Sequence, residues 1–306
     1  MQPTFLSSGD LIADRRADYA AALMESGDAS AAADLLEQAL DLAPGWAPGW
    51  FRLGEAREAA GHIEGAAAAY LRATELDPSD RLGAGLRLAR LNGAPAPDAP
   101  PPAYVRDLFD AYADRFEQHL VEALGYRAPQ AIAAVLARHG ATGPFGTVVD
   151  LGCGTGLMGP LLRPITGKLI GIDLSERMLA VAAAKQLYDR LEAADVVAAL
   201  EALPAGSVEL VTAADVFCYL GDLAPVLTAA AHALAPRGRL AFTVETDPAV
   251  GTGFTLRDSL RYAHAPASLM ALAGTLGFRV EAMETLDLRQ DRGAPVTGLA
   301  ALFTRS

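Results

Sequence analysis

The glycine-rich stretch VVDLGCGTGLMG, residues 148–159, is the part of the chain best suited to binding a nucleotide. Gly154, Gly156 and Gly159 satisfy the pattern G-x-G-x-x-G, in which missing side chains let backbone groups approach a ligand closely. Asp173 lies at the end of the next predicted strand, where a carboxylate can accept hydrogen bonds from both ribose hydroxyls. This spacing predicts a nucleotide-containing cofactor, and it fits either a nicotinamide dinucleotide or an S-adenosyl compound.

Two features separate these cofactors. Asp150 stands just before the glycine turn, where a carboxylate would be repelled by a pyrophosphate but would attract the α-ammonium group of a methionine moiety, directly or through water. The strand-like runs at 277–288 and 295–305 are joined without a helix, so they predict a closing hairpin whose last strand runs antiparallel to the others. Because a dinucleotide-binding sheet is all parallel, the sequence favours S-adenosylmethionine.

Alternating strands and helices must hold these residues in place. After helical stretches at 105–124 and 129–139, we expect strands at 147–151, 168–173, 190–193, 208–213 and 239–244, and helices at 156–163, 175–188, 223–234 and 266–276. The alternation predicts an α/β fold, a Rossmann-like sheet with helices on both faces. With the closing hairpin the sheet has seven strands, and the glycine loop lies at the carboxyl ends of the parallel ones.

The first part of the chain predicts a separate, small all-α domain. Pro44 and Pro78 each close a helical stretch at the spacing of one tetratricopeptide repeat, and Trp50, Gly54 and Tyr70 fit the pattern of the second copy. The proline- and alanine-rich segment 93–103 predicts a linker. We therefore expect a repeat domain at 1–92 and a second domain at 104–306, with an ordinary helical hairpin domain as the alternative to the repeats.

These motifs together resemble a known family. VVDLGCGTG is similar to the first motif of class I S-adenosylmethionine-dependent methyltransferases, LIGIDLSERML resembles their second motif, and ALAPRGRLAFTVE resembles the stretch leading into their fifth strand. With the repeats in front, the chain resembles the bacterial group of predicted methyltransferases that carry tetratricopeptide repeats. The stretch LFDAYADRFEQHLVEALGYRAP is typical of that group. The resemblance covers residues 104–306 and implies S-adenosyl-L-methionine as cofactor, without indicating the acceptor.

The resemblance also implies which residues bind the cofactor. Gly152, Gly154 and Gly156 would form the floor under its methionine portion. Asp173 would accept hydrogen bonds from the ribose hydroxyls, with capping of the following helix as the alternative. Leu174 would lie against the face of the adenine.

Two further segments complete this implied site. Asp195 and Val196 occupy the place where the family reads the adenine edge, although an exposed loop carboxylate is the alternative for Asp195. Ala214 and Asp215, after the fourth strand, should sit over the transferable methyl group.

Aromatic and basic side chains are the candidates for the chemistry itself. A sulfonium is attracted to aromatic faces, and Tyr112 with Phe116 and Phe217 with Tyr219 lie at spacings that place each pair near one site. Core packing is the alternative for each of them. His264, between the fifth strand and the following helix, is the best-placed general base, with a surface-loop histidine as the alternative.

Composition excludes several functional classes. The net charge is −12 and no basic block stands out, which argues against nucleic acid as a main partner. No apolar run is long enough to span a membrane and the N-terminus does not resemble a signal peptide. The two cysteines suit a reducing compartment, so we expect a cytoplasmic protein. No histidine–acid spacing indicates a metal site.

The sequence thus predicts an S-adenosylmethionine-dependent methyltransferase that acts on a small molecule or a protein by in-line displacement, with catalysis by positioning. Two alternatives are a protein-binding module with a non-catalytic cofactor domain and a nicotinamide-dependent oxidoreductase. The repeats are expected to bind a protein partner, to self-associate, or to act only as structure.

Overall fold

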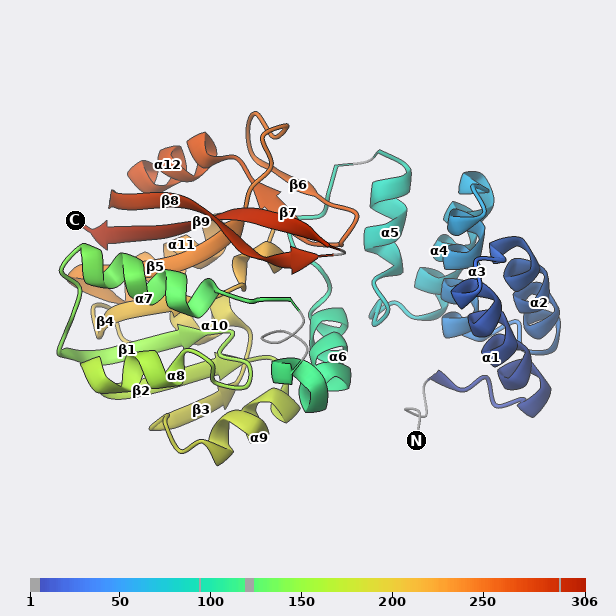
Figure 1. Cartoon of the computed structure of the whole chain (residues 1–306), viewed down its shortest axis with the longest axis horizontal. Coiled ribbons are helices and arrows are strands. Elements are labelled where there is room, and N and C mark those ends of the chain that lie inside the picture. The colour runs from blue at the N-terminus through green and yellow to red at the C-terminus, as the bar shows by residue number, and fades with distance from the viewer. Residues whose placement is uncertain (1–5, 94, 119–123, 292) are drawn as a thin grey trace. The chain divides into compact units, whose positions relative to one another are not determined.

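The computed structural model describes residues 6–93, 95–118, 124–291 and 293–306. The chain divides into two compact units, Met1–Tyr104 and Val105–Ser306 (Figure 1). Among the described helices, none combines the length and the apolar character that crossing a membrane requires.

The described part of the first unit is a succession of helices: α1 (Leu11–Glu25), α2 (Ala29–Leu42), α3 (Ala47–Ala59), α4 (Ile63–Leu76) and α5 (Ala84–Leu91). Asp10 and Asp28 start α1 and α2 by accepting hydrogen bonds from their first amides. Gly54 of α3 faces the ring of Tyr70 of α4, where an added β-carbon would lie 2.5 Å from Cε1. The missing side chain therefore lets the two helices of one repeat pack closely.

The second unit is built on one sheet, whose described strands are β1 (Phe145–Leu151), β2 (Thr166–Asp173), β3 (Arg190–Ala193), β4 (Val208–Ala213), β5 (Leu234–Glu245), β6 (Phe254–Leu256), β7 (Tyr262–His264), β8 (Phe278–Asp291) and β9 (Ala294–Arg305). Strands β1 to β5 are parallel in the order β3-β2-β1-β4-β5. Strand β9 is antiparallel to both β5 and β8, which confirms the predicted closing hairpin.

Helices cover both faces of this sheet (Figure 1). They are α7 (Ala128–Arg138), α8 (Gly159–Leu162), α9 (Glu176–Ala184), α10 (Val196–Glu201), α11 (Ala224–Ala233) and α12 (Pro266–Thr275). Helix α6 (Pro102–Tyr112) lies at the ends of the strands instead. Successive residues of β1 alternate between the faces. Val148 packs with residues of α7 and α8, whereas Val149 packs with residues of α10, α11 and α12. The predicted α/β architecture is therefore confirmed, with a core on each side of the sheet.

Several elements differ from the predictions. The short hairpin of β6 and β7 was not predicted, because strands of three residues are too short to show an alternating pattern. Helix α10 was missed because its β-branched start resembles a strand. The helix expected at 175–188 ends earlier, since Gln186 takes a left-handed φ of 56°. The helix expected at 105–124 is α6 followed by a short 3₁₀ turn, η2 (Ala113–Arg115), and residues 119–123 lie outside the described part.

Candidate active site

The glycine loop turns sharply at the end of β1. Gly152, Gly154 and Gly156 have φ values of 55°, 53° and 87°, a left-handed conformation that favours glycine. A β-carbon at Gly152 would lie 2.4 Å from Cγ2 of Val216, so this position also needs the missing side chain for space. The loop therefore offers bare backbone at the carboxyl ends of β1 and β4, as a cofactor floor requires.

Asp173 closes one side of this loop. Its Oδ2 accepts a hydrogen bond from the backbone N–H of Gly154 at 2.9 Å, and its Oδ1 accepts one from the N–H of Ser175 at 2.8 Å. Burial raises the pKa of Asp173, while these two bonds act in the opposite direction. Helix α9 is capped by Ser175, whose Oγ accepts from the N–H of Met178, so Asp173 is not the helix cap. Its oxygens keep lone pairs that a ribose hydroxyl can use.

Asp150 lies beneath the loop and is 1% exposed. Its oxygens accept hydrogen bonds from the hydroxyls of Tyr188, at 2.7 Å, and Thr212, at 2.8 Å. Burial raises the pKa of Asp150 to about 6, although both hydroxyls lower it. Attraction for the methionine ammonium stays a prediction, and the structure adds that Asp150 holds Tyr188.

Tyr188 was missed by sequence reasoning. Its ring lies where a β-carbon on Gly156 would be 3.1 Å from Cε2, and one on Gly159 would be 3.2 Å from the same atom. The ring therefore supports the loop from below. An isolated tyrosine between a helix and a strand carries no motif that would have revealed this role.

The residues predicted for the adenine side follow β2 and β3. Leu174 comes directly after Asp173 and is half-buried. Asp195 is half-buried and caps α10, because its Oδ1 accepts from the N–H groups of Val197 and Ala198 at 2.9 and 3.1 Å. The exposed-loop alternative for Asp195 is therefore wrong, and contact with adenine stays a prediction. Val196 is buried in the core beside the cap.

An aromatic wall, Phe109, Tyr112, Phe116 and Tyr219, runs from the glycine loop to the end of β4. The ring of Phe116 lies 3.9 Å from a β-carbon placed on Gly154. Ring centroids are 6.1 Å apart for Phe109 and Phe116, 5.7 Å for Tyr112 and Phe116, and 5.3 Å for Phe109 and Tyr219. The structure thus brings the two predicted aromatic groups together, although Phe217 is in the core instead.

Helix α6 and the turn after it lie beside the carboxyl ends of the strands (Figure 1). Asp110 accepts a hydrogen bond from the Ser175 hydroxyl at 2.5 Å, and Glu117 pairs with Lys185 at 2.5 Å. No described residue of α6 is fully buried. The segment 102–117 therefore has the character of a cover over the loop rather than of a core helix.

His264 lies in β7 and is only 3% exposed, so the surface-loop alternative is wrong. Its Nε2 is 3.1 Å from the carbonyl oxygen of Gly221. Because a carbonyl only accepts, Nε2 carries the proton and Nδ1 keeps a lone pair. Nδ1 has no hydrogen-bond partner among the described residues. Burial lowers the pKa of His264, which favours this neutral form.

Asp215 is the anchor of a buried ionic cluster that the sequence did not reveal. Its φ of 61° is unusual outside glycine. Its oxygens accept from Arg261 at 2.9 Å and Arg289 at 3.0 Å. Although burial alone would raise the pKa of Asp215, the two arginines hold it below its usual range. The predicted place of this residue over the methyl group stays a prediction, but its oxygens already have partners.

Glu245, at the end of β5, completes this cluster. It pairs with Arg289 at 2.5 Å and with Arg257 at 3.2 Å. Ligand atoms of Asp215, Cys218 and Glu245 lie within 4.8 Å of one another, a spacing that could hold a metal ion. Because arginines already neutralise both carboxylates, we assign no metal to this group. Arg289 stands in a segment expected to be a loop, which is why its partnership was missed.

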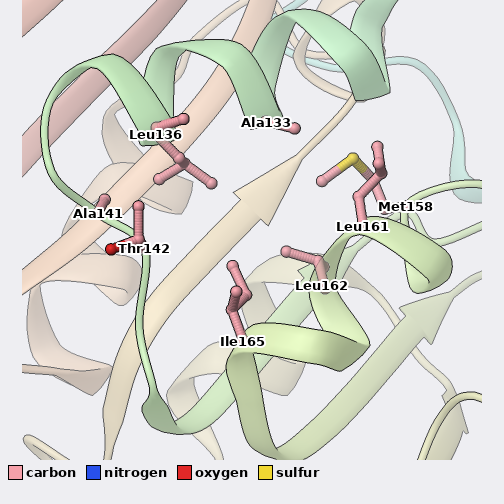
Figure 2. A pocket seen from close by; sticks show the side chains of 9 residues that line it. Ala133, Leu136, Ala141, Thr142, Met158, Leu161, Leu162 and Ile165 are labelled. Atoms are coloured by element: carbon pink, nitrogen blue, oxygen red, sulfur yellow. The ribbon is translucent and has the colours of Figure 1, made fainter.

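A separate pocket of about 150 Å³ lies between α7 and α8 (Figure 2). Its lining is apolar except for Thr142, and includes Leu136, Met158 and Ile165. None of the predicted site residues lines it. It offers no charged group and is not part of the candidate site.

Comparisons with known proteins agree with this geometry. Residues 149–242 match the family described as a methyltransferase domain, and residues 23–91 match the tetratricopeptide repeat. The chain is 30% identical over 170 residues to a ubiquinone biosynthesis O-methyltransferase of Ralstonia nicotianae, an alignment that covers 51% of this chain and 70% of that protein.

Two solved structures show the same fold. The magnesium protoporphyrin IX methyltransferase of Synechocystis with bound S-adenosylmethionine has a TM-score of 0.51 and 18% identity, covering 67% of this chain and 97% of that one. The 1,6-didemethyltoxoflavin-N1-methyltransferase of Burkholderia thailandensis with bound S-adenosylhomocysteine has a TM-score of 0.53 and 17% identity, covering 69% and 92%.

Fold, loop and relatives together define an enzyme that uses S-adenosylmethionine. The chain belongs to the S-adenosylmethionine-dependent methyltransferases and carries tetratricopeptide repeats at its N-terminus. The nicotinamide alternative and the non-catalytic alternative are therefore set aside. The bare glycine loop and the carboxylate of Asp173 beside it fit this cofactor.

Proposed function

We propose that the enzyme methylates a small molecule inside a covered site. The observation that carries this proposal is the position of the segment 102–117, which contacts Ser175 after β2 and Tyr219 after β4. An acceptor must reach the methyl group beneath this cover, which suits a small molecule better than a side chain of a folded protein. The curated relative, an O-methyltransferase of ubiquinone biosynthesis, supports the same class of acceptor.

Catalysis in this proposal is by positioning. Bound S-adenosylmethionine supplies a methyl group on a sulfonium, which is already a good leaving group. The glycine loop and Asp173 fix the cofactor, and the aromatic wall excludes water from the reacting groups. Alignment of the acceptor with the carbon–sulfur bond can supply about 7–11 kcal/mol. No enzyme nucleophile is needed, and Cys218 is a buried thiol whose pKa is raised by burial.

His264 and Tyr219 are the proposed contributors to the chemical step. His264 presents a neutral Nδ1 lone pair, the form that can take a proton from an acceptor hydroxyl. The ring of Tyr219 has the guanidinium of Arg261 at 4.9 Å, so a sulfonium would need the other face. If His264 is only structural, His264→Gln will leave the pH profile of methyl transfer unchanged.

The test of the acceptor class uses cell extract and cofactor labelled in the methyl group. We expect the label to enter the low-molecular-mass fraction with the wild type and to be absent with the Asp173→Ala variant. Label recovered in protein bands would contradict the small-molecule proposal and would favour a protein acceptor.

We propose that the repeats serve interaction rather than catalysis, with a protein partner or a second copy of the chain as the bound species. Helix α1 supports this role because Leu11, Ile12 and Tyr19 are 67%, 57% and 70% exposed. Light scattering of the purified chain tests self-association, since a single-chain mass would exclude a second copy of the chain as the bound species.

A further inference from the structure

The ionic cluster at the ends of β4 and β5 contains a structural link and two additional arginines. Arg289 is the link: one nitrogen donates to Asp215 at 3.0 Å and the other to Glu245 at 2.5 Å. Its side chain is 3% exposed. Both terminal nitrogens of Arg289 therefore donate to carboxylates of the protein itself.

Arg257 and Arg261 contact the carboxylates that Arg289 links. Arg257 pairs with Glu245 at 3.2 Å, and Arg261 lies 2.9 Å from Asp215 and 3.6 Å from Glu245. Three guanidinium groups thus share two carboxylates, which leaves one positive charge in excess. An unbalanced positive charge beside two buried carboxylates is unexpected in a chain whose net charge is −12.

These two arginines also keep donors that the described protein does not use. Within the described residues, each makes its side-chain hydrogen bonds through Nη1 alone. A guanidinium has five N–H groups, so Nη2 and Nε remain available. The side chains of Arg257 and Arg261 are 33% and 18% exposed, which allows a ligand to reach them.

The cluster adjoins the proposed site of methyl transfer. Arg261 lies over the ring of Tyr219, which contacts Phe109, which in turn contacts Phe116 beside Gly154. On the other side Val216, next to Asp215, packs on Gly152. Contacts along the aromatic wall therefore connect Arg261 to the glycine loop.

We propose that Arg257 and Arg261 bind an anionic group of the methyl acceptor, a carboxylate or a phosphate, and so make the enzyme selective for acidic acceptors. The inference rests on the proposed small-molecule methyltransferase function and names its substrate class. Arginine forks match the oxygens of both anions. An acceptor held there by its acidic group would direct its other end along the aromatic wall toward the cofactor.

The experiment titrates protein saturated with S-adenosylhomocysteine by calorimetry, using benzoate, phenyl phosphate and the neutral analogue benzamide. We expect at least one anion to bind and benzamide not to bind. In Arg257→Gln and in Arg261→Gln the affinity for the anion should fall by about tenfold or more, the loss expected when a charge-assisted hydrogen bond is removed. Whichever anion binds more tightly identifies the acidic group.

Arg279→Gln is the matched control, because Arg279 is 72% exposed on β8 and pairs only with Glu281 among the described residues. Its anion affinity should equal that of the wild type. Equal binding of benzamide and benzoate, or unchanged binding in both test variants, would overturn the inference.

Two further outcomes separate this inference from the proposed function. If Arg261→Gln loses affinity for S-adenosylhomocysteine, the arginines hold the carboxylate of the cofactor, and the acceptor assignment is wrong. If the wild type binds S-adenosylhomocysteine but neither anion, the acidic-acceptor inference fails while the methyltransferase function stands. Failure of the wild type to bind S-adenosylhomocysteine would overturn both.

Discussion

Asp173 is the residue on which the cofactor assignment depends most. Replacing it with alanine removes a carboxylate that two backbone amides already orient toward the loop. Loss of its charge-assisted bonds to ribose should cost about 3 kcal/mol or more. We predict that calorimetry will find no measurable affinity of Asp173→Ala for S-adenosylhomocysteine, although the variant remains folded. The exposed carboxylate Glu201 is the control, and its alanine variant should bind normally.

The raised pKa of Asp150 leads to a prediction about how the stability of the protein depends on pH. Burial raises the pKa of Asp150 in the folded protein to about 6, above the ordinary 3.8. As the pH falls, the folded state therefore binds the proton before the unfolded state does. Stability from this group is therefore present at low pH and is lost as pH rises through about 6. We predict that the wild type will gain unfolding free energy relative to Asp150→Asn, by up to about 3 kcal/mol, between about pH 7 and about pH 4. A difference independent of pH would show that Asp150 has an ordinary pKa.

At the scale of elements, the cover formed by α6 decides how the site closes. Tyr112 is half-buried and meets Phe116 edge to face at 5.7 Å. No described residue of α6 is fully buried, so the helix is not part of the core. We predict that Tyr112→Phe weakens binding of S-adenosylhomocysteine while the melting temperature of the cofactor-free protein is nearly unchanged. Leu108→Ala, which shortens a side chain of the same helix that is 40% exposed, should change neither.

The opposite pattern, a large loss of stability with normal cofactor binding, would show that Tyr112 is part of the core. The site would then be closed by another element.

Sequence patterns predicted the parts of this fold that have strong local signals. The glycine loop, the strand ending at Asp173 and the closing hairpin each follow from residue types at fixed spacing. The ionic cluster does not, because Asp215, Glu245 and Arg289 come from three strand ends far apart in sequence. Only the sheet order brings them together, and the unpredicted hairpin of β6 and β7 lies next to Arg261.

At the scale of the whole molecule, we expect the two units to unfold independently, with residues 104–306 able to bind cofactor alone. Both tryptophans of the chain, Trp46 and Trp50, lie in the repeats, so their fluorescence reports only on that unit. We predict that S-adenosylhomocysteine raises the melting temperature seen by circular dichroism for the second unit and leaves the tryptophan transition unchanged. A fragment 104–306 that is insoluble, or a ligand shift in the tryptophan transition, would show that the repeats are part of the catalytic unit's packing.

The most direct test of the account is a crystal structure of the chain with S-adenosylhomocysteine. We predict that both ribose hydroxyls will lie within hydrogen-bond distance of the Asp173 carboxylate. The methionine portion should rest on the backbone of Gly152 and Gly154, with the sulfur facing the end of β4. A ribose bound away from Asp173, or a ligand outside the carboxyl ends of β1, β2 and β4, would contradict the proposed site.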